Sequence, residues 1–172
     1  TEEAKVPAIL YNVPSRTGCS LAASTVAYLA KNAEYVTAIK EASGDISHVA
    51  DIMYACDGAI DLYSGNDDQI VPILSLGGKG VISVLSNVAP KETHDIVALF
   101  LEGKIKESRE LQLKALPLVH ALFSEVNPIP VKAALNLMGK EVGPLRLPLT
   151  EMEAAHQEVL VEEMKKFGIK LA

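Results

Sequence analysis

The chain is poor in the residues that nucleic-acid-binding proteins use. Its 172 residues include no tryptophan, aromatic residues make up 5% of the sequence, and the formal net charge is −6. Single-stranded nucleic acids are bound by stacking bases on aromatic rings, and phosphate backbones are bound by clustered lysine and arginine. The composition therefore predicts no nucleic-acid partner.

Cysteine is also scarce. Cys19 and Cys56 lack the spacing of a metal site, and we expect both to be small core residues. Unpaired cysteines are typical of a reducing compartment, so the expected location is cytoplasmic. The four histidines show no ligand spacing either, and no metal site is predicted.

The sequence lacks a long, uninterrupted apolar run. Its most apolar region, 70–88, contains Pro72, two consecutive glycines and Lys79. A membrane-spanning helix needs about 20 predominantly apolar residues. The region therefore predicts a helix followed by a strand, and we expect no membrane partner.

What the sequence does contain, up to residue 103, is a regular alternation of strand and helix patterns. Apolar strands are predicted at 8–13, 35–39, 59–63 and 80–85. Helices are predicted at 21–32, 46–55, 67–76 and 90–102. Four βα units of this kind predict an α/β fold with a parallel sheet.

From residue 104 onward only helical patterns follow. They cover 105–123, 131–138 and about 150–168, and a capping box at 150–153 opens the last one. We therefore predict two domains, 1–103 and 104–172. Four parallel strands would leave two open sheet edges, and a closed (β/α)8 TIM barrel has about 250 residues. The expected architecture is the second half of such a barrel followed by a C-terminal helical domain.

Polar residues stand at the ends of the predicted strands, where barrels place their active sites. Lys40 follows Val36 and Ala38 at a spacing of two, so the three should share one face. If that face is a barrel interior, burial disfavours the charged ammonium, and a neutral amine can form a Schiff base with a ketone. The alternative is a solvent-exposed lysine at a strand end, and strand position alone slightly favours it.

Three further candidates each have an ordinary alternative. Tyr11 ends the preceding strand at the depth of Lys40, so its phenol could relay a proton or simply line the rim. Arg16 could bind a carboxylate through two parallel hydrogen bonds or be a surface charge. Gly65 permits close approach of a small ligand or only forms a turn.

Two other patterns carry less chemistry. The glycine-rich segment 77–80 lacks the long spacer of a phosphate-binding loop and precedes a strand. Asp67 and Asp68 suit the first turn of a helix better than a metal site.

Five motifs then occur in order along the chain. They are Tyr11-Asn-Val-Pro-Ser-Arg-Thr-Gly18, Ile39-Lys-Glu-Ala-Ser-Gly44, Tyr63-Ser-Gly-Asn-Asp-Asp68, Gly77-Gly-Lys-Gly-Val-Ile-Ser-Val84 and Asn127-Pro-Ile-Pro-Val-Lys132. Together they resemble the 4-hydroxy-tetrahydrodipicolinate synthase (dihydrodipicolinate synthase) family of pyruvate-dependent class I aldolases. The resemblance extends over essentially the whole chain and corresponds to the second half of the family's barrel with its helical domain.

The resemblance implies a role for each candidate. Lys40 would form the imine with pyruvate, Tyr11 would relay protons, and Arg16 would hold the carboxylate of L-aspartate semialdehyde. Gly65 and Ile82 would line the pyruvate pocket, largely through their backbone. The implied reaction belongs to lysine (diaminopimelate) biosynthesis and needs no metal or organic cofactor. The implied assembly is a homo-oligomer, a dimer of dimers.

The resemblance leaves alternatives open. Sialic-acid lyases share the tyrosine and lysine but generally lack the Arg-Thr-Gly loop, whereas sugar-acid aldolases are nearer competitors. Asn66 stands where aspartate is common in the family. The family's relay threonine and second relay tyrosine belong to the first half-barrel, which these motifs do not include. A half-barrel that serves only as an assembly partner is therefore a further hypothesis.

Overall fold

The computed structural model describes residue 3 and residues 5–172. Contacts divide the chain after Ile82 into two compact units, the first carrying the sheet and the second entirely helical. Helix α5 (Pro90–Leu101) packs against α6 (Ile105–Leu122), and so it belongs to the second unit. The predicted division between a half-barrel, 1–103, and a helical domain, 104–172, stays a prediction.

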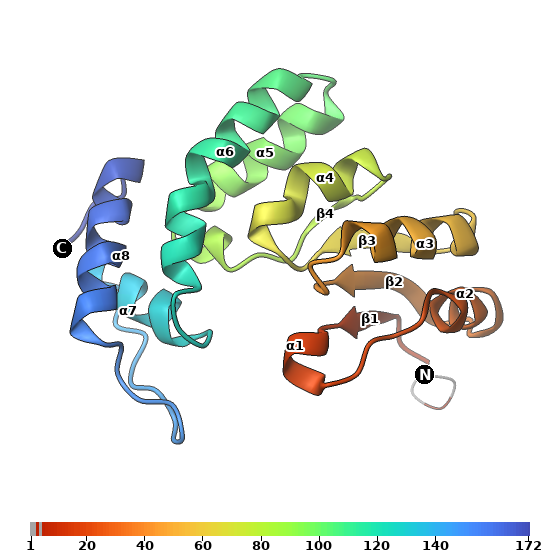
Figure 1. Cartoon of the computed structure of the whole chain (residues 1–172), viewed down its shortest axis with the longest axis horizontal. Helices are drawn as coiled ribbons and strands as arrows, with labels where there is room; N and C mark the ends of the chain where they lie inside the picture. The colour runs from red at the N-terminus through yellow and green to blue at the C-terminus, as the bar shows by residue number, and fades with distance from the viewer. Residues whose placement is uncertain (1–2, 4) are drawn as a thin grey trace. The chain divides into compact units, whose positions relative to one another are not determined.

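The first unit contains one parallel sheet of four strands in the order β1-β2-β3-β4 (Figure 1). The strands are β1 (Ala8–Asn12), β2 (Val36–Glu41), β3 (Asp61–Ser64) and β4 (Gly80–Val81). The α/β class and the parallel sheet are therefore confirmed. Strand β2 extends through Lys40, which lies within the strand and not after it.

The predicted fourth strand, 80–85, was too long. It ends at Val81, and a 3-10 helix, η2 (Leu85–Asn87), follows. The hydroxyl of Ser83 accepts a hydrogen bond from the Ser86 amide at 2.9 Å, and the Ser86 hydroxyl donates to the Ser83 carbonyl at 3.1 Å. These local bonds offer the backbone a turn in place of a ladder.

Helices cover one face of the sheet. They are α2 (Ala23–Asn32), α3 (Ile46–Cys56) and α4 (Ile70–Ser75), the last preceded by the 3-10 turn η1 (Asp67–Gln69) (Figure 1). Ile39 and Leu62 are fully buried between sheet and helices, each contributing about 1.5–3 kcal/mol of hydrophobic burial.

The two cysteines differ. Cys56 is buried in the core between sheet and helices, and burial raises the pKa of its thiol. Cys19 is exposed in the segment between α1 (Pro14–Thr17) and α2, so its predicted core position was wrong. The sequence shows an apolar neighbourhood around Cys19 but not that the segment leaves the sheet.

The sheet register shifts by one residue at the start of β2. Ala8 pairs with Val36, but the next residue, Ile9, pairs with Ala38, so Thr37 is extra. Val36 consequently packs with Ile39 in the helix-facing core. The prediction that Val36 shares a face with Lys40 was therefore wrong, because strict alternation fails where a strand carries an extra residue.

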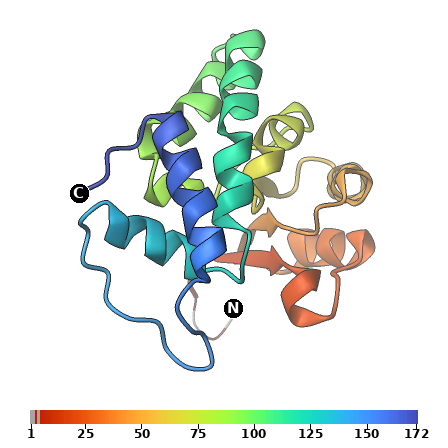
Figure 2. The ribbon, with the colours of Figure 1, turned by 60° about the vertical axis from the view of Figure 1, so that its left-hand side comes forward.

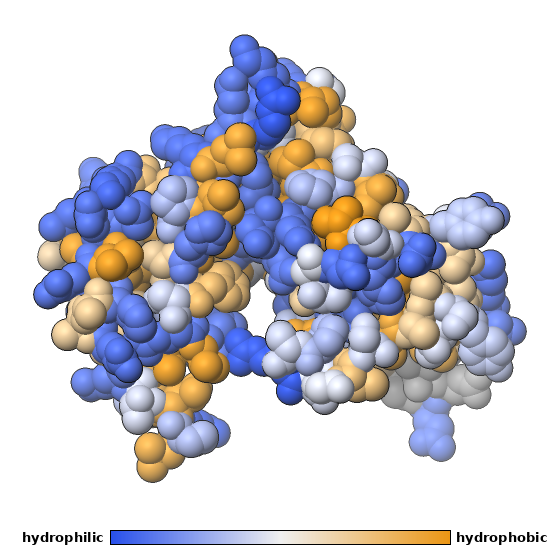
Figure 3. All heavy atoms as spheres, viewed as in Figure 1, coloured by the Kyte–Doolittle hydropathy of each residue, from blue (hydrophilic) through white to orange (hydrophobic). Residues whose placement is uncertain are grey.

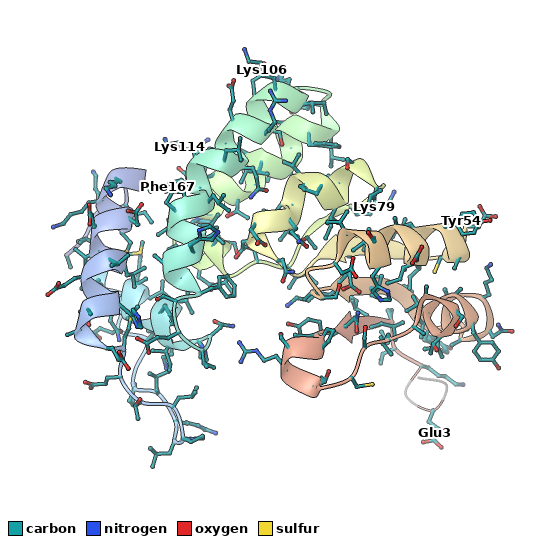
Figure 4. All side chains as sticks on the ribbon, viewed as in Figure 1. Glu3, Tyr54, Lys79, Lys106, Lys114 and Phe167 are labelled. Atoms are coloured by element: carbon teal, nitrogen blue, oxygen red, sulfur yellow. The ribbon has the colours of Figure 1, made fainter. Side chains whose placement is uncertain are left out.

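The second unit is built on a long helix, α6, which runs alongside α8 (Ala154–Phe167) (Figures 1 and 2). Its core includes the fully buried Leu122, Leu160 and Met164. The Lys114 ammonium lies 5.5 Å from the centroid of the Phe167 ring, which joins the two helices at one end (Figure 4).

Helix α8 does not start with the predicted capping box. Glu153 is its N-cap residue, and its own side chain makes no capping bond. Instead, Glu125 Oε1 accepts a hydrogen bond from the Glu153 amide at 2.9 Å and lies 2.9 Å from His156 Nδ1. The bond to His156, followed by the bond from the Glu153 amide, holds the pKa of Glu125 below its usual range. The helix ends at Gly168, as predicted, and this glycine adopts the left-handed conformation.

A long loop joins α7 (Ile129–Leu137) to α8. It borders a cleft of about 630 Å³ with α7, and Leu147 in this loop is 88% exposed. Hydrophobic residues gather at the outer end of the loop, whereas elsewhere the visible surface mixes hydrophilic and hydrophobic residues (Figure 3). Within the described residues, no helix combines the length and apolarity that crossing a bilayer requires.

Candidate active site at the strand ends

The parallel register sets four residues side by side near the C-terminal ends of the strands. Tyr11 pairs with Lys40, Lys40 with Tyr63, and Tyr63 with Gly80. Residues paired in this way point to the same face of a sheet. The row therefore places one tyrosine on each side of the lysine, on the face opposite the helices.

Lys40 and Tyr11 are in direct contact. The Lys40 ammonium lies 4.1 Å from the centroid of the Tyr11 ring. Lys40 is partly buried, and Tyr11 is 50% exposed. A cation held over an aromatic face is attracted by the ring's quadrupole, so the phenol and the amine are kept together before any ligand arrives. The predicted proximity of these two side chains is confirmed.

Gly65 touches the same lysine. A Cβ atom at this position would lie 3.1 Å from Lys40 Cε, 3.1 Å from the Glu41 carbonyl and 2.6 Å from Ala42 Cβ. The last distance is too short for two carbon atoms. The Gly65 amide also donates to the Glu41 carbonyl at 2.7 Å. Glycine is needed here because two backbone segments approach closely beside the lysine stem.

Ile82 follows the short strand β4 next to Gly65. Its amide donates to the Ser64 carbonyl at 2.8 Å, and its side chain is 41% exposed. The backbone of Ile82 is thus tied to the residue that precedes Gly65. This arrangement fits a role in which Ile82 lines the site through its backbone.

Arg16 lies in the short helix α1, which forms part of the rim segment after β1. Pro14 occupies the first turn of α1, and Gly18 ends it in the left-handed conformation with its amide bonded to the Pro14 carbonyl at 2.9 Å. Arg16 is exposed on this turn, which follows β1 at the end of the strand that carries Tyr11. The helix fixes the backbone of Arg16 just beyond the end of the strand that carries Tyr11.

Sequence reasoning missed Tyr63 as a neighbour of Lys40. Its ring carbons lie 3.6 and 3.7 Å from where a Cβ of Gly80 would stand, so the ring covers that glycine. Counting back from each strand end would have found Tyr63, because it stands two residues before Gly65 on the same face.

The patterns set aside in the sequence are structural. The segment 77–80 forms the turn from α4 into β4: a Cβ at Gly78 would lie 2.8 Å from the Ile73 carbonyl, and Lys79 is exposed (Figure 4). Asp67 is buried in the turn η1. Within residues 3 and 5–172, no three His, Cys, Asp or Glu side chains gather in a way that could hold a metal ion.

Comparison with known proteins places this chain in a family. The model of the dihydrodipicolinate synthetase family matches residues 1–167. The 4-hydroxy-tetrahydrodipicolinate synthase of Lachnoclostridium phytofermentans is 62% identical over 164 residues, which cover 95% of this chain and 56% of that protein.

Solved structures agree in fold. The crystal structure of dihydrodipicolinate synthase from Thermotoga maritima superposes with a TM-score of 0.94 at 42% identity, covering 97% of this chain and 58% of that one. A monomeric dihydrodipicolinate synthase variant gives a TM-score of 0.94 at 40% identity, covering 98% and 57%. The chain thus spans about half the length of the relatives it matches. On a match of this extent and identity, the chain belongs to the dihydrodipicolinate synthetase family.

Proposed function

We propose that this chain is the second half of a (β/α)8 barrel with a C-terminal helical domain, and that it supplies the Schiff-base lysine of a 4-hydroxy-tetrahydrodipicolinate synthase. The observation that carries the proposal is the Lys40 ammonium 4.1 Å from the Tyr11 ring, with Gly65 against the lysine stem. The reaction would join pyruvate to L-aspartate semialdehyde. The name of the relatives supports these substrates.

The chemistry begins at Lys40. Its neutral amine attacks the ketone carbon of pyruvate, and the carbinolamine loses water to give an imine. We assign Tyr11, whose ring is in contact with the amine, to carry the proton that leaves nitrogen to the departing hydroxyl. The protonated imine then draws electrons from the neighbouring methyl group, which loses a proton and becomes an enamine carbon.

The second half of the reaction forms the carbon–carbon bond. The enamine carbon adds to the aldehyde of L-aspartate semialdehyde, and the imine nitrogen regains its positive charge. The substrate's own amine attacks that iminium carbon, expels Lys40 and closes the ring of the cyclic dicarboxylate. The electron sink throughout is the imine between Lys40 and pyruvate, so we propose that no other cofactor takes part.

Binding of the substrates is assigned to three further residues. Arg16 is exposed on α1, and a guanidinium can hold a carboxylate with two parallel hydrogen bonds. We assign it to the carboxylate of the second substrate. Gly65 and Ile82 are assigned to the pyruvate pocket, largely through their backbone, because Gly65 lies against the Lys40 stem and the Ile82 amide is bonded to the residue before Gly65.

Further proposals concern the complete protein. We infer a cytoplasmic location, supported by two unpaired cysteines, and a homo-oligomer built as a dimer of dimers. The remaining barrel strands would pair with the open edges of β1 and β4. The competing functions are another pyruvate-dependent aldolase, such as a sugar-acid aldolase or a sialic-acid lyase, and a half-barrel without catalysis of its own.

Imine trapping tests the proposal. The 172-residue chain, alone and fused to the N-terminal part of the Lachnoclostridium phytofermentans relative, is mixed with pyruvate and reduced with borohydride. We expect one adduct in the fusion, on Lys40, and none in its Lys40→Arg variant. Adducts spread over surface lysines, or none in the fusion, would overturn the nucleophile assignment. An adduct on the chain alone would show that the second half forms the imine without the first.

The second substrate separates the aldolases. Changing Arg16 to Ala in the fusion should leave pyruvate trapping unchanged and raise the KM for L-aspartate semialdehyde. Equal loss of both would contradict the role of Arg16. Turnover of a sugar acid in place of the semialdehyde would favour the sugar-acid aldolase.

A further inference from the structure

Directly behind the lysine, on the helix-facing side of the sheet, lies a second row of polar residues. Asn12 pairs with Glu41, and Glu41 pairs with Ser64, one position beyond the row that contains Lys40. Asn12 and Glu41 are each 1% exposed, and Ser64 is fully buried. A buried carboxylate is costly unless hydrogen bonds compensate for its lost hydration.

The compensation comes from two loops. Asn12 Nδ2 donates to Glu41 Oε2 at 2.8 Å. The other oxygen, Glu41 Oε1, accepts from the Ser43 amide at 2.6 Å, and Asn12 Oδ1 accepts from the Leu21 amide at 3.0 Å. The pair thus closes the segment from Asn12 to Leu21, which includes α1, and fixes the first residues after β2.

We infer that Asn12 and Glu41, here called the strand-end pair, are positioning residues of the site, and this rests on the proposed function. The segment closed at Asn12 and Leu21 carries Arg16, and Lys40 immediately precedes Glu41. One buried hydrogen bond therefore couples the backbone that bears the guanidinium to the strand that bears the amine. Both members of the pair point to the helix-facing side of the sheet, whereas the Lys40 side chain points to the opposite face.

A charge exchange isolates this coupling. In Asn12→Asp, two carboxylates would face each other across 2.8 Å. In Glu41→Gln, the side-chain amide of Asn12 and the backbone amide of Ser43 would compete for the one remaining oxygen at position 41. In the double variant, the new amide at position 41 can donate to the new carboxylate at position 12, while the Leu21 and Ser43 amides keep their acceptors. Ser20, whose hydroxyl lies 3.4 Å from Asn12 Nδ2, can rotate its proton to serve the new carboxylate.

The first measurement is amide exchange on the 172-residue chain. Leaving a buried polar group unsatisfied should increase exchange at Leu21 and Ser43 by about 5- to 150-fold in each single variant. The double variant should return close to the wild-type rates. Unchanged exchange in the single variants, or no recovery in the double variant, would overturn the claim that the strand-end pair holds the two loops. If Glu41→Gln does not fold, Glu41→Asp, which keeps the charge and withdraws it by one methylene, replaces it.

The second measurement separates positioning from general stability. In the fusion protein, each single variant should raise the KM for L-aspartate semialdehyde and lower the rate of trapping on Lys40 per folded molecule. The double variant should recover both. A purely structural role would lower the folded amount and leave KM unchanged, which would overturn the positioning role. Absence of an adduct in the wild-type fusion would overturn the proposed function together with this role, whereas amide exchange would still decide whether the pair holds the two loops.

Discussion

Replacing Gly65 by alanine should destabilise the first unit, whereas the same change at Gly80 should not. Neither glycine has the positive φ that makes an L-residue strained, so the two differ in the space available. At Gly65 the new methyl would meet Ala42 Cβ at 2.6 Å, and at Gly80 its nearest contact would be the Tyr63 ring at 3.6 Å. The first is an overlap, and the second is ordinary packing.

The magnitude follows from two opposing effects. Overpacking typically costs about 1–3 kcal/mol, and the reduced freedom of the unfolded chain returns about 0.4–1 kcal/mol. For Gly65→Ala we expect a net loss of about 1–2 kcal/mol, which lowers the folded-to-unfolded ratio about 5- to 30-fold. For Gly80→Ala only the gain from the reduced freedom of the unfolded chain remains. The free energy of unfolding of this variant should therefore be unchanged or rise by up to about 1 kcal/mol.

The chain contains its own probe for this test. It has no tryptophan, and all five of its tyrosines fall within 11–63, in the first unit. Tyrosine fluorescence during urea unfolding therefore reports on the unit that contains both glycines. Equal midpoints for the two variants would refute the reasoning, because they would show that Ala42 and the Glu41 carbonyl yield to a methyl group at no cost.

Three further predictions concern other parts of the chain. A thiol reagent should modify Cys19 at once and Cys56 only on unfolding, since burial raises the pKa of Cys56; two fast thiols in native protein would contradict its burial. The pKa of Glu125 is lowered in the fold, so the stability it contributes is present above its unfolded pKa, about 4.3, and is lost as pH falls towards the lowered value. Glu125→Gln should remove this part of the acid sensitivity in circular-dichroism melts at several pH values, and an unchanged pH profile would count against the bond to His156. Ile39→Ala should cost about 2–5 kcal/mol in the same tyrosine-monitored unfolding, because Ile39 is fully buried; a loss below about 1 kcal/mol would show that the core collapses around the cavity.

Much of the first unit could be predicted from the sequence because its strands are apolar runs separated by clear breaks. The alternation predicted the parallel sheet, and the strand ends predicted that Tyr11 would meet Lys40. The start of α8 could not be predicted, because the carboxylate that accepts its first amide comes from Glu125, 28 residues earlier in the chain. Local patterns do not encode a partner at that separation.

The candidate site was predicted incompletely for a related reason. Tyr63, Asn12 and Glu41 each stand in a quoted motif, yet their positions follow from register, which a single strand does not reveal. The register in turn depends on Thr37, whose extra place in β2 breaks the alternation of the strand. A strict count of two from Val36 reaches Lys40, but the structure turns Val36 towards the helices.

The extra residue in β2 has a consequence for how this sequence can change over time. Thr37 is exposed and has no partner position in β1, so many side chains are acceptable there. Without it, Val36 and Ala38 would follow each other opposite Ala8 and Ile9, and Lys40 would keep its place opposite Tyr11. Losing a paired residue such as Ile39 would instead set Lys40 opposite Leu10 and turn it towards the helices. Changes at position 37, including its loss, are therefore expected to be tolerated among functional relatives, whereas loss of a paired residue before Lys40 is expected to abolish the reaction.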